Sequence, residues 1–311
     1  MAAIPLKFGG YQGPASVHTR AGHVFGKALS EELGGTVDFS FDANIIERGR
    51  KASDLLDMVE SGSLDACYFS SSYLASRVPE LGIFDQHFIV PDRARAYAVL
   101  DGALGRELAG LMREKTGYAV LDFWDNGFRH ISNGKGPILA PPDCAGLKIR
   151  TLANDNHQRV FRALGFEPKT IDVRDLPAAV ADGTVDAQEN PLTNIYNFGL
   201  HAHHKYITLT RHLIGVAMVL FNKDAVNAWP SDFREGVQRA LRKATVAQRG
   251  FADEDDTVCA EKLVAEGVEI AELHGDQRLA FVDATKDEVA KTRGQFDARL
   301  IGLFDEDLAG G

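Results

Sequence analysis

The sequence lacks long hydrophobic runs and an excess of positive charge. No apolar stretch approaches the roughly 18–20 residues that a helix needs to span a bilayer. The 34 Lys and Arg residues are outnumbered by 44 Asp and Glu residues, which gives a formal charge of −10 at pH 7. Because a nucleic-acid-binding protein needs a basic surplus to neutralise phosphates, we expect no nucleic-acid partner. The acidic surplus is typical of a soluble surface.

Cysteine is scarce as well. The three cysteines, Cys67, Cys144 and Cys259, lie far apart, and none belongs to a Cys-x-x-Cys or Cys/His motif with zinc-binding spacing. An odd number of cysteines excludes a complete set of intramolecular disulfides. Because free cysteine is among the residues most often buried, we predict three buried thiols.

Motifs of catalysis and phosphate binding are also missing. The chain contains no Gly-x-Ser-x-Gly elbow, no Gly-x-x-x-x-Gly-Lys-Ser/Thr loop and no His-Glu-x-x-His pair. An enzyme would have to use Cys67 or a serine of 70–72 as nucleophile, with His87 as base, and proximity in the chain does not establish that geometry. We therefore predict that the protein is not an enzyme and has no cofactor, and we keep catalysis as an alternative.

The N-terminus lacks the features of a secretory signal. Residues 1–7, Met-Ala-Ala-Ile-Pro-Leu-Lys, contain neither a basic stretch nor an apolar core. Two explanations are open at this point: a signal was removed from this chain, or the protein stays in the cytoplasm.

What the chain does contain is a repeated alternation of apolar and amphipathic segments. A length of 311 residues is about twice that of a typical domain, so we expect two lobes. In each half, apolar runs typical of buried parallel strands alternate with helical patterns, which predicts doubly wound α/β lobes. The expected strands span 6–11, 36–41, 64–69, 147–151, 169–171 and 185–188, and the expected helices span 15–33, 51–60, 156–164 and 176–181.

A short motif occurs in both halves. Gly62-Ser-Leu-Asp-Ala66 and Gly183-Thr-Val-Asp-Ala187 share the pattern Gly-[Ser/Thr]-[Leu/Val]-Asp-Ala. We predict that each glycine ends a helix in the left-handed conformation and that a strand follows. The strands deliver Ser70 and Asn190 to loops, and ligands of open α/β sheets bind beyond the carboxyl ends of strands. The motif therefore favours one cleft shared by 70–72 and Asn190, although it is also a common helix-stop device.

The longest helical pattern runs from about 231 to 266. Trp229-Pro230-Ser231-Asp232 supplies a proline and N-cap candidates at its start. A helix of this length measures about 50 Å at about 1.5 Å per residue, more than the diameter of one lobe, so it must lie across both lobes. Gly236 and Gly250 weaken the pattern, and either could introduce a bend.

Three segments in the middle of the chain carry a family resemblance. They are Gly146-Leu-Lys-Ile-Arg150, Asp182-Gly-Thr-Val-Asp-Ala-Gln-Glu-Asn-Pro191 and Lys205-Tyr-Ile-Thr-Leu-Thr210. In this order and spacing they resemble the solute-binding subunits of tripartite ATP-independent periplasmic (TRAP) transporters. The resemblance implies a periplasmic receptor whose signal peptide has been removed, which favours the first of the two explanations above.

The resemblance also implies a fold and a function. The fold would be α/β, a two-lobed periplasmic binding protein fold, type II-like, with a long helix bridging both lobes. Lobe I would comprise 1–126 and 215–253, and lobe II 127–214 and 254–311. The receptor would be a monomer that binds a small organic carboxylate in the interlobe cleft, closes around it and delivers it to the membrane subunits of a secondary transporter. A ligand-binding subunit of a signalling system and an enzyme acting on a small carboxylate are the alternatives.

The ligand contacts follow from the same resemblance. Arg150 would grip the carboxylate, since a guanidinium offers two parallel donors to its two oxygens, and Asn190 would hydrogen-bond the same ligand. Arg129 would touch the ligand or support the residues that do. Without the resemblance, Arg150 would be interpreted as a strand-end arginine paired with a neighbouring acid, and Asn190 as a turn residue before proline. Further candidate contacts are Tyr11, Gln12, Ser70, Ser71, Tyr73, Trp124, Val173 and Asn194.

Two positions depart from the family pattern. Val173 stands where the family usually has a bulky aromatic ring, and Gln86-His87-Phe88 replaces the usual Leu-Pro-Phe. Such side chains set the size of a pocket, so the identity of the acid stays open. The expected carboxylate anchor is not affected.

A metal site is the last possibility that the sequence raises. His201, His203 and His204 form a His-x-His-His cluster without a carboxylate or Cys ligand at standard spacing, so we expect a solvated surface there. We predict no bound metal. A cation near Gln188 and Glu189, which some family members hold through a carboxylate, is the alternative.

Overall fold

A computed structural model describes residues 3–311 and divides the chain into two compact units. Unit 1 consists of the chain up to Ser70, Glu107–Asp125 and Val216–Glu254. Unit 2 consists of Ser71–Arg106, Asn126–Gly215 and Asp255–Gly311. The segment 71–106, which the sequence analysis assigned to lobe I, belongs to unit 2.

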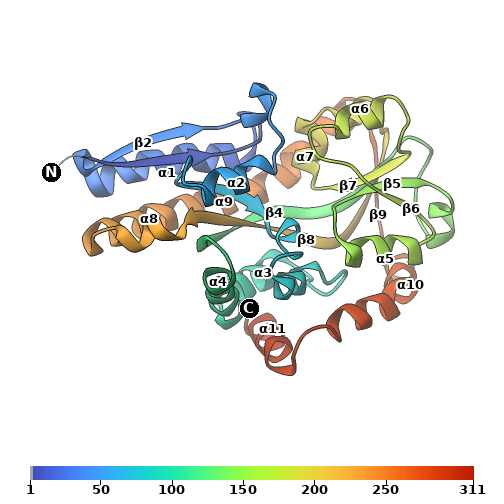
Figure 1. Ribbon diagram of the computed structural model, residues 1–311. Helices are drawn as coiled ribbons and strands as arrows, with labels where there is room; N and C mark the ends of the chain where they lie inside the picture. The colour runs from blue at the N-terminus through green and yellow to red at the C-terminus, as the bar shows by residue number, and fades with distance from the viewer. Residues whose placement is uncertain (1–2) are drawn as a thin grey trace. The chain divides into compact units, whose positions relative to one another are not determined.

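Unit 1 is built on parallel strands. β1 (Ile4–Gly9) lies between β2 (Val37–Asp42) and β3 (Ala66–Ser70), and β8 (Tyr206–Asn222) runs antiparallel beside β3. The connections are α1 (Val17–Leu33) and α2 (Asp54–Glu60), shown in blue in Figure 1. The shorter elements of this unit are the 3-10 turns η1 (Gly34–Thr36) and η2 (Ile45–Arg48) and helix α8 (Lys223–Ala228).

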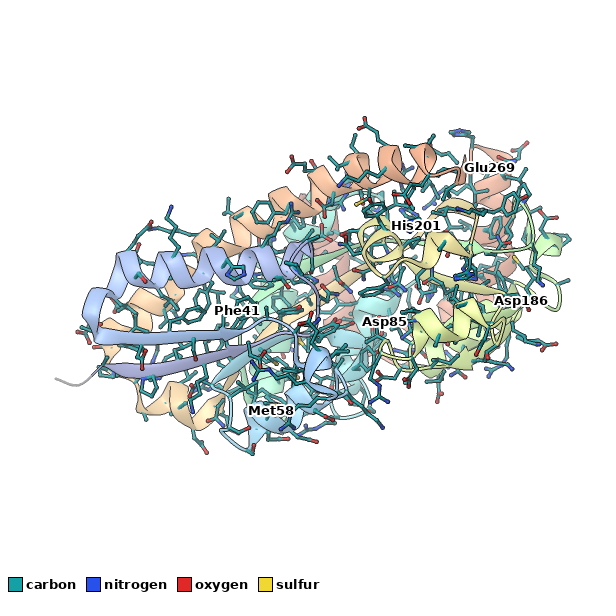
Figure 2. The ribbon with its side chains drawn as sticks, turned by 90° about the horizontal axis from the view of Figure 1, so that it is seen from above. Phe41, Met58, Asp85, Asp186, His201 and Glu269 are labelled. Carbon is teal, nitrogen blue, oxygen red and sulfur yellow. The ribbon has the colours of Figure 1, made fainter. Side chains whose placement is uncertain are left out.

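Local sequence explains how α1 begins and where it packs. The Ser16 hydroxyl accepts a hydrogen bond from the His18 N–H (3.1 Å), which satisfies one of the free donors at the helix start. A Cβ atom at Gly22 would lie 2.5 Å from the Phe41 ring, which is labelled in Figure 2, and one at Gly26 would lie 2.4 Å from the Phe39 ring. The two glycines therefore let α1 lie directly on the aromatic side chains of β2.

Unit 2 repeats the parallel arrangement. β5 (Lys148–Thr151) lies between β6 (Glu167–Thr170) and β7 (Ala187–Asn190), and β7 pairs antiparallel with β4 (Tyr118–Asn133). The crossover helices are α5 (Asp155–Ala163) and α6 (Leu176–Ala181). The other elements on this part of the chain are η5 (Pro141–Cys144), α7 (Leu192–Asn197), η6 (Leu200–Ala202) and β9 (Glu269–Glu272), which pairs parallel with β8.

The segment 71–106 is held in unit 2 by the C-terminal helices. It contains the 3-10 turns η3 (Ser71–Tyr73) and η4 (Pro79–Asp85), helix α3 (Arg93–Asp101) and the start of α4 (Ala103–Lys115). α3 packs on α11 (Ala298–Gly310), where Arg95 Nη1 donates to the Leu308 carbonyl (2.9 Å), and η4 contacts α5 and α10 (Asp276–Arg293). The partners of α3 lie at the end of the chain, far from it in sequence. Local sequence patterns therefore could not reveal that 71–106 belongs to unit 2.

The predicted strands and helices are confirmed, with end points that shift by a few residues. The two motif glycines have the predicted left-handed conformation: Gly62 and Gly183 both have φ of +75°, directly after α2 and α6. The three cysteines are free and buried, as predicted. Burial raises the pKa of Cys144 to about 12 and that of Cys259 to about 11, so these thiols are unreactive near neutral pH.

Three long elements continue from one unit into the other along the chain. They are β4, β8 and α9 (Ser231–Ala265). α9 confirms the long helix predicted for 231–266, and it contributes residues up to Glu254 to unit 1 and the remainder to unit 2. Within residues 3–311, every helix is too short or too polar to cross a membrane.

The two glycines of α9 should respond in opposite ways to a methyl group. Gly250 is exposed and has nothing within 4 Å of a built Cβ, so Gly250→Ala should raise the free energy of unfolding by about 0.5–1 kcal/mol. At Gly236 a Cβ would lie 2.4 Å from Leu33, so Gly236→Ala should lower it through overpacking, by about 1–3 kcal/mol. Urea unfolding measures the change in the free energy of unfolding for both variants. A stabilised Gly236→Ala protein would contradict the close packing of α9 on α1 at Leu33.

Candidate functional site

Only two Lys or Arg side chains are buried in the described part of the chain. They are Arg129, with 2% of its surface exposed, and Arg150, with 1% exposed, and both belong to unit 2. A buried charge is costly unless it is paired and hydrogen-bonded, so what surrounds each guanidinium determines what it can do.

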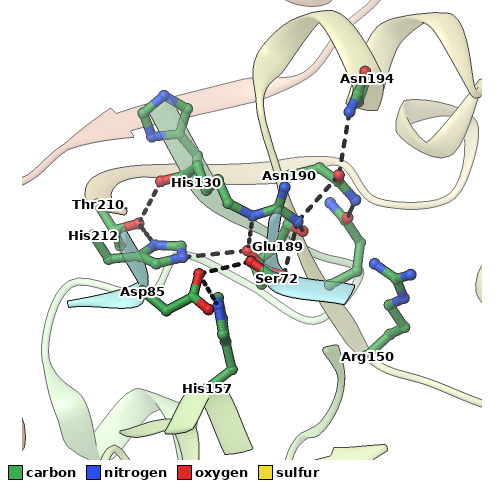
Figure 3. Close-up of polar contacts among 12 residues, drawn as sticks. Ser72, Asp85, His130, Arg150, His157, Glu189, Asn190, Asn194, Thr210 and His212 are labelled. Atoms are coloured by element: carbon green, nitrogen blue, oxygen red, sulfur yellow. Dashed lines mark hydrogen bonds and ion pairs between the residues drawn. The ribbon is translucent and has the colours of Figure 1, made fainter. Parts of the chain in front are cut away.

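The charge of Arg129 is neutralised within the protein. Its Nε forms a buried ion pair with Glu189 Oε2, and its Nη2 donates to Glu189 Oε1 (2.8 Å) and to the Glu189 carbonyl (2.6 Å). Nη2 also donates to Asn190 Oδ1 (3.2 Å), as Figure 3 shows. Arg129 therefore holds the Asn190 side chain in place while its own charge is balanced by Glu189.

Backbone geometry brings this arginine to the end of β7. Gly127 has φ of +82°, and a Cβ there would lie 2.6 Å from Pro191 Cβ. Only glycine combines a left-handed conformation with such a close approach. The antiparallel register of β4 and β7, which pairs His130 with Asn190, then sets Arg129 beside the Glu189–Asn190 segment.

Glu189 has a second partner, the buried His212 on β8. His212 Nε2 lies 3.4 Å from Glu189 Oε2, and His212 Nδ1 lies 2.7 Å from the Thr210 hydroxyl. Burial alone would raise the pKa of Glu189, but the charge of Arg129 and the hydrogen bonds from His212 and Arg129 hold that pKa below its ordinary value. Glu189 is therefore ionised at neutral pH, which keeps Arg129 neutralised.

Arg150 has no such acidic partner. Its Nε donates to the Ile171 carbonyl (2.9 Å) and its Nη2 to the Tyr73 hydroxyl (3.4 Å), and both of these groups are neutral. Among residues 3–311, no carboxylate forms an ion pair with it. Arg150 thus presents a buried positive charge with unmet capacity for an anion, and a carboxylate matches the two-donor geometry of a guanidinium.

A series of amide side chains continues from Asn190. Asn190 Nδ2 donates to Gln188 Oε1 (2.5 Å), and Asn194 Nδ2, from α7, donates to Asn190 Oδ1 (3.4 Å). Gln188 Nε2 donates in turn to the Ser132 hydroxyl (2.6 Å). In the parallel register of β5 and β7, Gln188 pairs with Arg150, so the series begins beside the unneutralised guanidinium.

A buried histidine cluster lies against the other side of Glu189. The His87 ring stacks on His212 at 5.6 Å between centroids and meets His157 edge-on at 4.8 Å. His157 Nε2 lies 3.3 Å from the Asp85 carboxylate, which also accepts from Ser72 Oγ and Asn154 Nδ2 (2.6 Å each). Figure 3 shows the contacts of Asp85 with Ser72 and His157.

The remaining predicted contacts lie in both units. In unit 1, Tyr11, Gln12 and Ser70 are buried beyond β1 and at the end of β3. Trp124 is fully buried in unit 1, where its indole N–H donates to the Thr245 hydroxyl (3.0 Å), so its contacts are those of a core residue. In unit 2, Ser71 is buried and Tyr73 and Val173 are half-buried.

The expectation of a solvated His-x-His-His surface is wrong for two of its three members. His201 and His204 are buried, and only His203 is exposed. His201 pairs with Glu266 (2.8 Å) and stacks on Tyr196, and His204 Nδ1 lies 3.1 Å from the Ser132 hydroxyl. Their partners come from distant segments, which is why the local cluster could not predict them.

No metal site is evident in the described residues. Across 3–311, no group of three or more His, Cys, Asp and Glu side chains is placed to hold a metal ion. Near Gln188, the Glu189 carboxylate is already neutralised by Arg129, so a cation there would compete with a buried guanidinium.

One pocket of unit 2 is lined without any cationic side chain. It has a volume of about 310 Å³ and contains no basic side chain, so it offers no anchor for a carboxylate. Its lining is Ser72, Ala75, Ser76, Pro79, Gly82, Ala153, Asn154, Asp155, Asn156 and Gln295.

The sequence analysis considered Glu189 only as a possible cation ligand and did not predict its ion pair with Arg129, and it did not name His212. Glu189 directly precedes Asn190, and His212 comes two residues after the Lys205–Thr210 motif, so both were adjacent to quoted segments. The charge of Glu189 was a usable signal. A glutamate in a buried strand, next to a predicted ligand residue, requires a cationic partner.

The histidines of unit 2 should make stability fall on mild acidification. Burial lowers the pKa of His87, His130 and His212, and it lowers that of His204 to about 4. Because these values lie below the ordinary 6.5, the unfolded chain binds more protons as pH falls from about 6.5 towards the folded values. The free energy of unfolding should then drop by up to about 1.4 kcal/mol per pH unit for each such histidine.

Urea unfolding at pH 7.5, 6.0 and 5.0 measures this slope. His87→Phe removes one titrating ring while keeping an aromatic side chain, so its slope should be shallower below pH 6.5 and equal to that of the parent protein between pH 7.5 and 8.5. A slope that is flat between pH 7.5 and 5.0 in the parent protein would contradict the expectation.

Comparison with known proteins identifies the family. The family model "Bacterial extracellular solute-binding protein, family 7" matches residues 8–295. A solute-binding protein of Verminephrobacter eiseniae is 32% identical, and the match covers 89% of this chain and 80% of that protein. An uncharacterized protein of Sinorhizobium fredii is 33% identical over 94% of this chain, which spans only 53% of that protein's length.

Solved structures give the same result. A TRAP periplasmic solute-binding protein from Polaromonas, bound to D-erythronate, is 28% identical with a TM-score of 0.90, covering 97% of this chain and 98% of that one. One from Sulfurospirillum deleyianum with bound succinate is 28% identical with a TM-score of 0.85, covering 94% and 99%. The sugar acid binding protein from Advenella mimigardefordensis, in complex with galactonate, is 25% identical with a TM-score of 0.94, covering all of both chains.

These matches confirm the predicted fold, that of the two-lobed TRAP solute-binding proteins. The family model covers nearly the whole chain, and relatives and solved structures agree with it. The chain therefore belongs to family 7 of the bacterial extracellular solute-binding proteins, the solute receptors of TRAP transporters.

Proposed function

We propose that the protein binds a small organic acid through Arg150 and presents it to the membrane subunits of a TRAP transporter. The observation that carries the proposal is the buried guanidinium of Arg150, whose described hydrogen-bond partners are the neutral Ile171 carbonyl and Tyr73 hydroxyl. A carboxylate would supply the missing charge and form charge-assisted hydrogen bonds with it.

The ligands of related structures support a carboxylate. D-erythronate, succinate and galactonate differ in length and in hydroxyl content, and a carboxylate is the group they share. Ligands that differ in other groups but share a carboxylate are consistent with one fixed cationic anchor in the receptor. Arg150, at the end of β5, is the described residue of this chain best suited to that role.

Asn190 and Asn194 are the proposed neighbours of the anchor. Asn190 is positioned by Arg129 and Gln188, so its amide does not need to be ordered when a ligand arrives. An amide both donates and accepts, which suits a carboxylate oxygen or a ligand hydroxyl. In this proposal Arg129 acts through Asn190 and is a positioning residue.

The proposed function also includes where the protein acts and what happens to its ligand. Receptors of this family act in the periplasm, so we place the protein there, as a monomer that returns its ligand chemically unchanged. Transport is favoured over a signalling role because the matched relatives are TRAP receptors. No cofactor and no metal take part.

The two buried arginines give a matched test. Arg150→Met should remove the ligand-induced rise in melting temperature, while leaving the ligand-free protein at least as stable, because it deletes an unneutralised buried charge. Arg129→Met should lower the free energy of unfolding by about 3–5 kcal/mol, because it strands the buried Glu189 carboxylate.

Thermal unfolding with and without D-erythronate, galactonate and succinate measures both effects. An Arg150→Met protein that keeps the full ligand-induced shift of the parent would overturn the assignment of the anchor. Equal ligand-free stability of the two variants would show that Arg129 and Arg150 do not differ in their neutralisation.

A further inference from the structure

We propose that the histidine cluster formed by His87, His157 and His212 fastens the segment 85–90 to the rest of unit 2 and releases it when the protein is acidified. All three rings are buried and belong to unit 2. His87 stands where the family pattern has a proline, so the cluster is a feature of this chain rather than of that pattern. The release needs no bound ligand, so it stands apart from the proposed function.

The cluster joins segments that lie far apart in the sequence. The His87 ring lies parallel to that of His212 on β8, with 5.6 Å between centroids and 11° between planes, and it meets His157 of α5 at 4.8 Å. The Phe161 ring packs edge-on against His87 at 5.9 Å and against His212 at 5.5 Å. His87 is thus enclosed by aromatic rings, and these contacts attach 85–90 to α5 and β8.

Strained backbone on both sides of the stack supports a dedicated role for it. Phe88, directly after His87, has φ of +63°, and Arg211, directly before His212, has φ of +42°. Residues other than glycine rarely adopt this left-handed region, and they stay there only where the surrounding structure holds them. The Phe88 N–H donates to the His212 carbonyl (2.6 Å), which joins the two strained segments. The strained residues therefore set the two imidazole rings face to face.

In this packed arrangement His87 has no place for a second proton. Its Nδ1 lies 3.1 Å from the Asp85 carbonyl oxygen, and a carbonyl only accepts, so Nδ1 carries the proton of the neutral ring. Its Nε2 is buried and has no hydrogen-bond partner among residues 3–311. A proton on Nε2 would leave a buried N–H without an acceptor, on a charged ring beside His157 and His212. Burial and these neighbouring rings accordingly lower the pKa of His87.

The charged groups around the cluster do not offer His87 an acceptor. The Glu189 carboxylate faces His212 Nε2 at 3.4 Å. The Asp85 carboxylate faces His157 Nε2 at 3.3 Å. Each carboxylate thus serves one of the other two rings. The remaining ionisable side chains near the cluster are basic, and they are Arg93 of α3, Arg129 and His130 of β4, Arg211 of β8 and Arg278 of α10.

Acid should therefore favour a loosened state in which His87 reaches water. In that state the pKa of His87 returns to about 6.5, whereas it lies lower in the packed state. The loosened state then binds one more proton as pH falls below about 6.5, and its population rises by up to about tenfold per pH unit. Between pH 7.5 and 5.0 the expected increase is roughly 30-fold. Above pH 7.5 both states are neutral at His87, and the segment stays packed.

Hydrogen exchange of the ligand-free parent protein measures the release. The Phe88 amide is the most direct reporter, because its hydrogen bond crosses from the segment to β8. Protection factors of peptides covering 85–90, corrected for the intrinsic exchange rate at each pH, should fall roughly 30-fold between pH 7.5 and 5.0. These values should be the same in 0 and 1 M urea, because a local opening exposes little surface and global unfolding exposes much. Protection that is unchanged with pH, or that falls with urea at pH 5.0, would overturn the proposal.

Two phenylalanine variants identify the ring that responds. His87→Phe keeps an aromatic side chain and removes the titrating group, so protection of 85–90 should change by no more than about threefold over the same pH range. His204→Phe is the matched control, because His204 is also buried in unit 2 with a pKa lowered to about 4 but contacts Ser132 instead of the cluster. It should respond as the parent protein does. An equal acid response of His87→Phe and the parent would overturn the role of His87. The pH and urea dependence of the parent decides the local release even if His87→Phe does not fold.

Discussion

The buried ion pair between Arg129 and Glu189 is the interaction on which the candidate site depends. It joins β4 to the end of β7, and the same guanidinium that meets Glu189 also holds the Asn190 side chain. Because the pair is closed within the protein, its charges cancel, and it positions the neighbouring Asn190. In the proposed function, the binding of an anion falls to Arg150.

The fold creates this division through backbone constraints rather than through the side chains alone. Gly127, in a left-handed conformation against Pro191, allows β4 to bring Arg129 to Glu189. Gly183 ends α6 with the same kind of backbone and starts the chain into β7. The parallel register of β5 and β7 then places Arg150 beside Gln188, one strand away from the neutralised pair.

The sequence predicted the parts of this arrangement that are local, and it could not predict those that are remote. Some features follow from sequence patterns no longer than one helix. They are the periodicities of the strands and helices, the left-handed glycines Gly62 and Gly183, and the long helix α9. The placement of 71–106 in unit 2 and the burial of His201 and His204 depend on partners from distant segments. Arg129 and Arg150 lie between these cases. The family motifs named both residues, but only the structure shows that Arg129 has an acidic partner and that the described partners of Arg150 are neutral.

In the proposed function, the unneutralised buried charge of Arg150 links the stability of the receptor to its ligand. Without an anion, Arg150 carries a desolvation cost that its two neutral partners offset only in part. In the proposed function, a bound carboxylate would remove that desolvation cost, so part of the binding free energy would come from a cost already present in the ligand-free protein. If a glutamate neutralised Arg150 as Glu189 neutralises Arg129, the proposed anchor would have no charge left for an acid. The site is thus defined as much by the carboxylate that is missing beside Arg150 as by the one that is present beside Arg129.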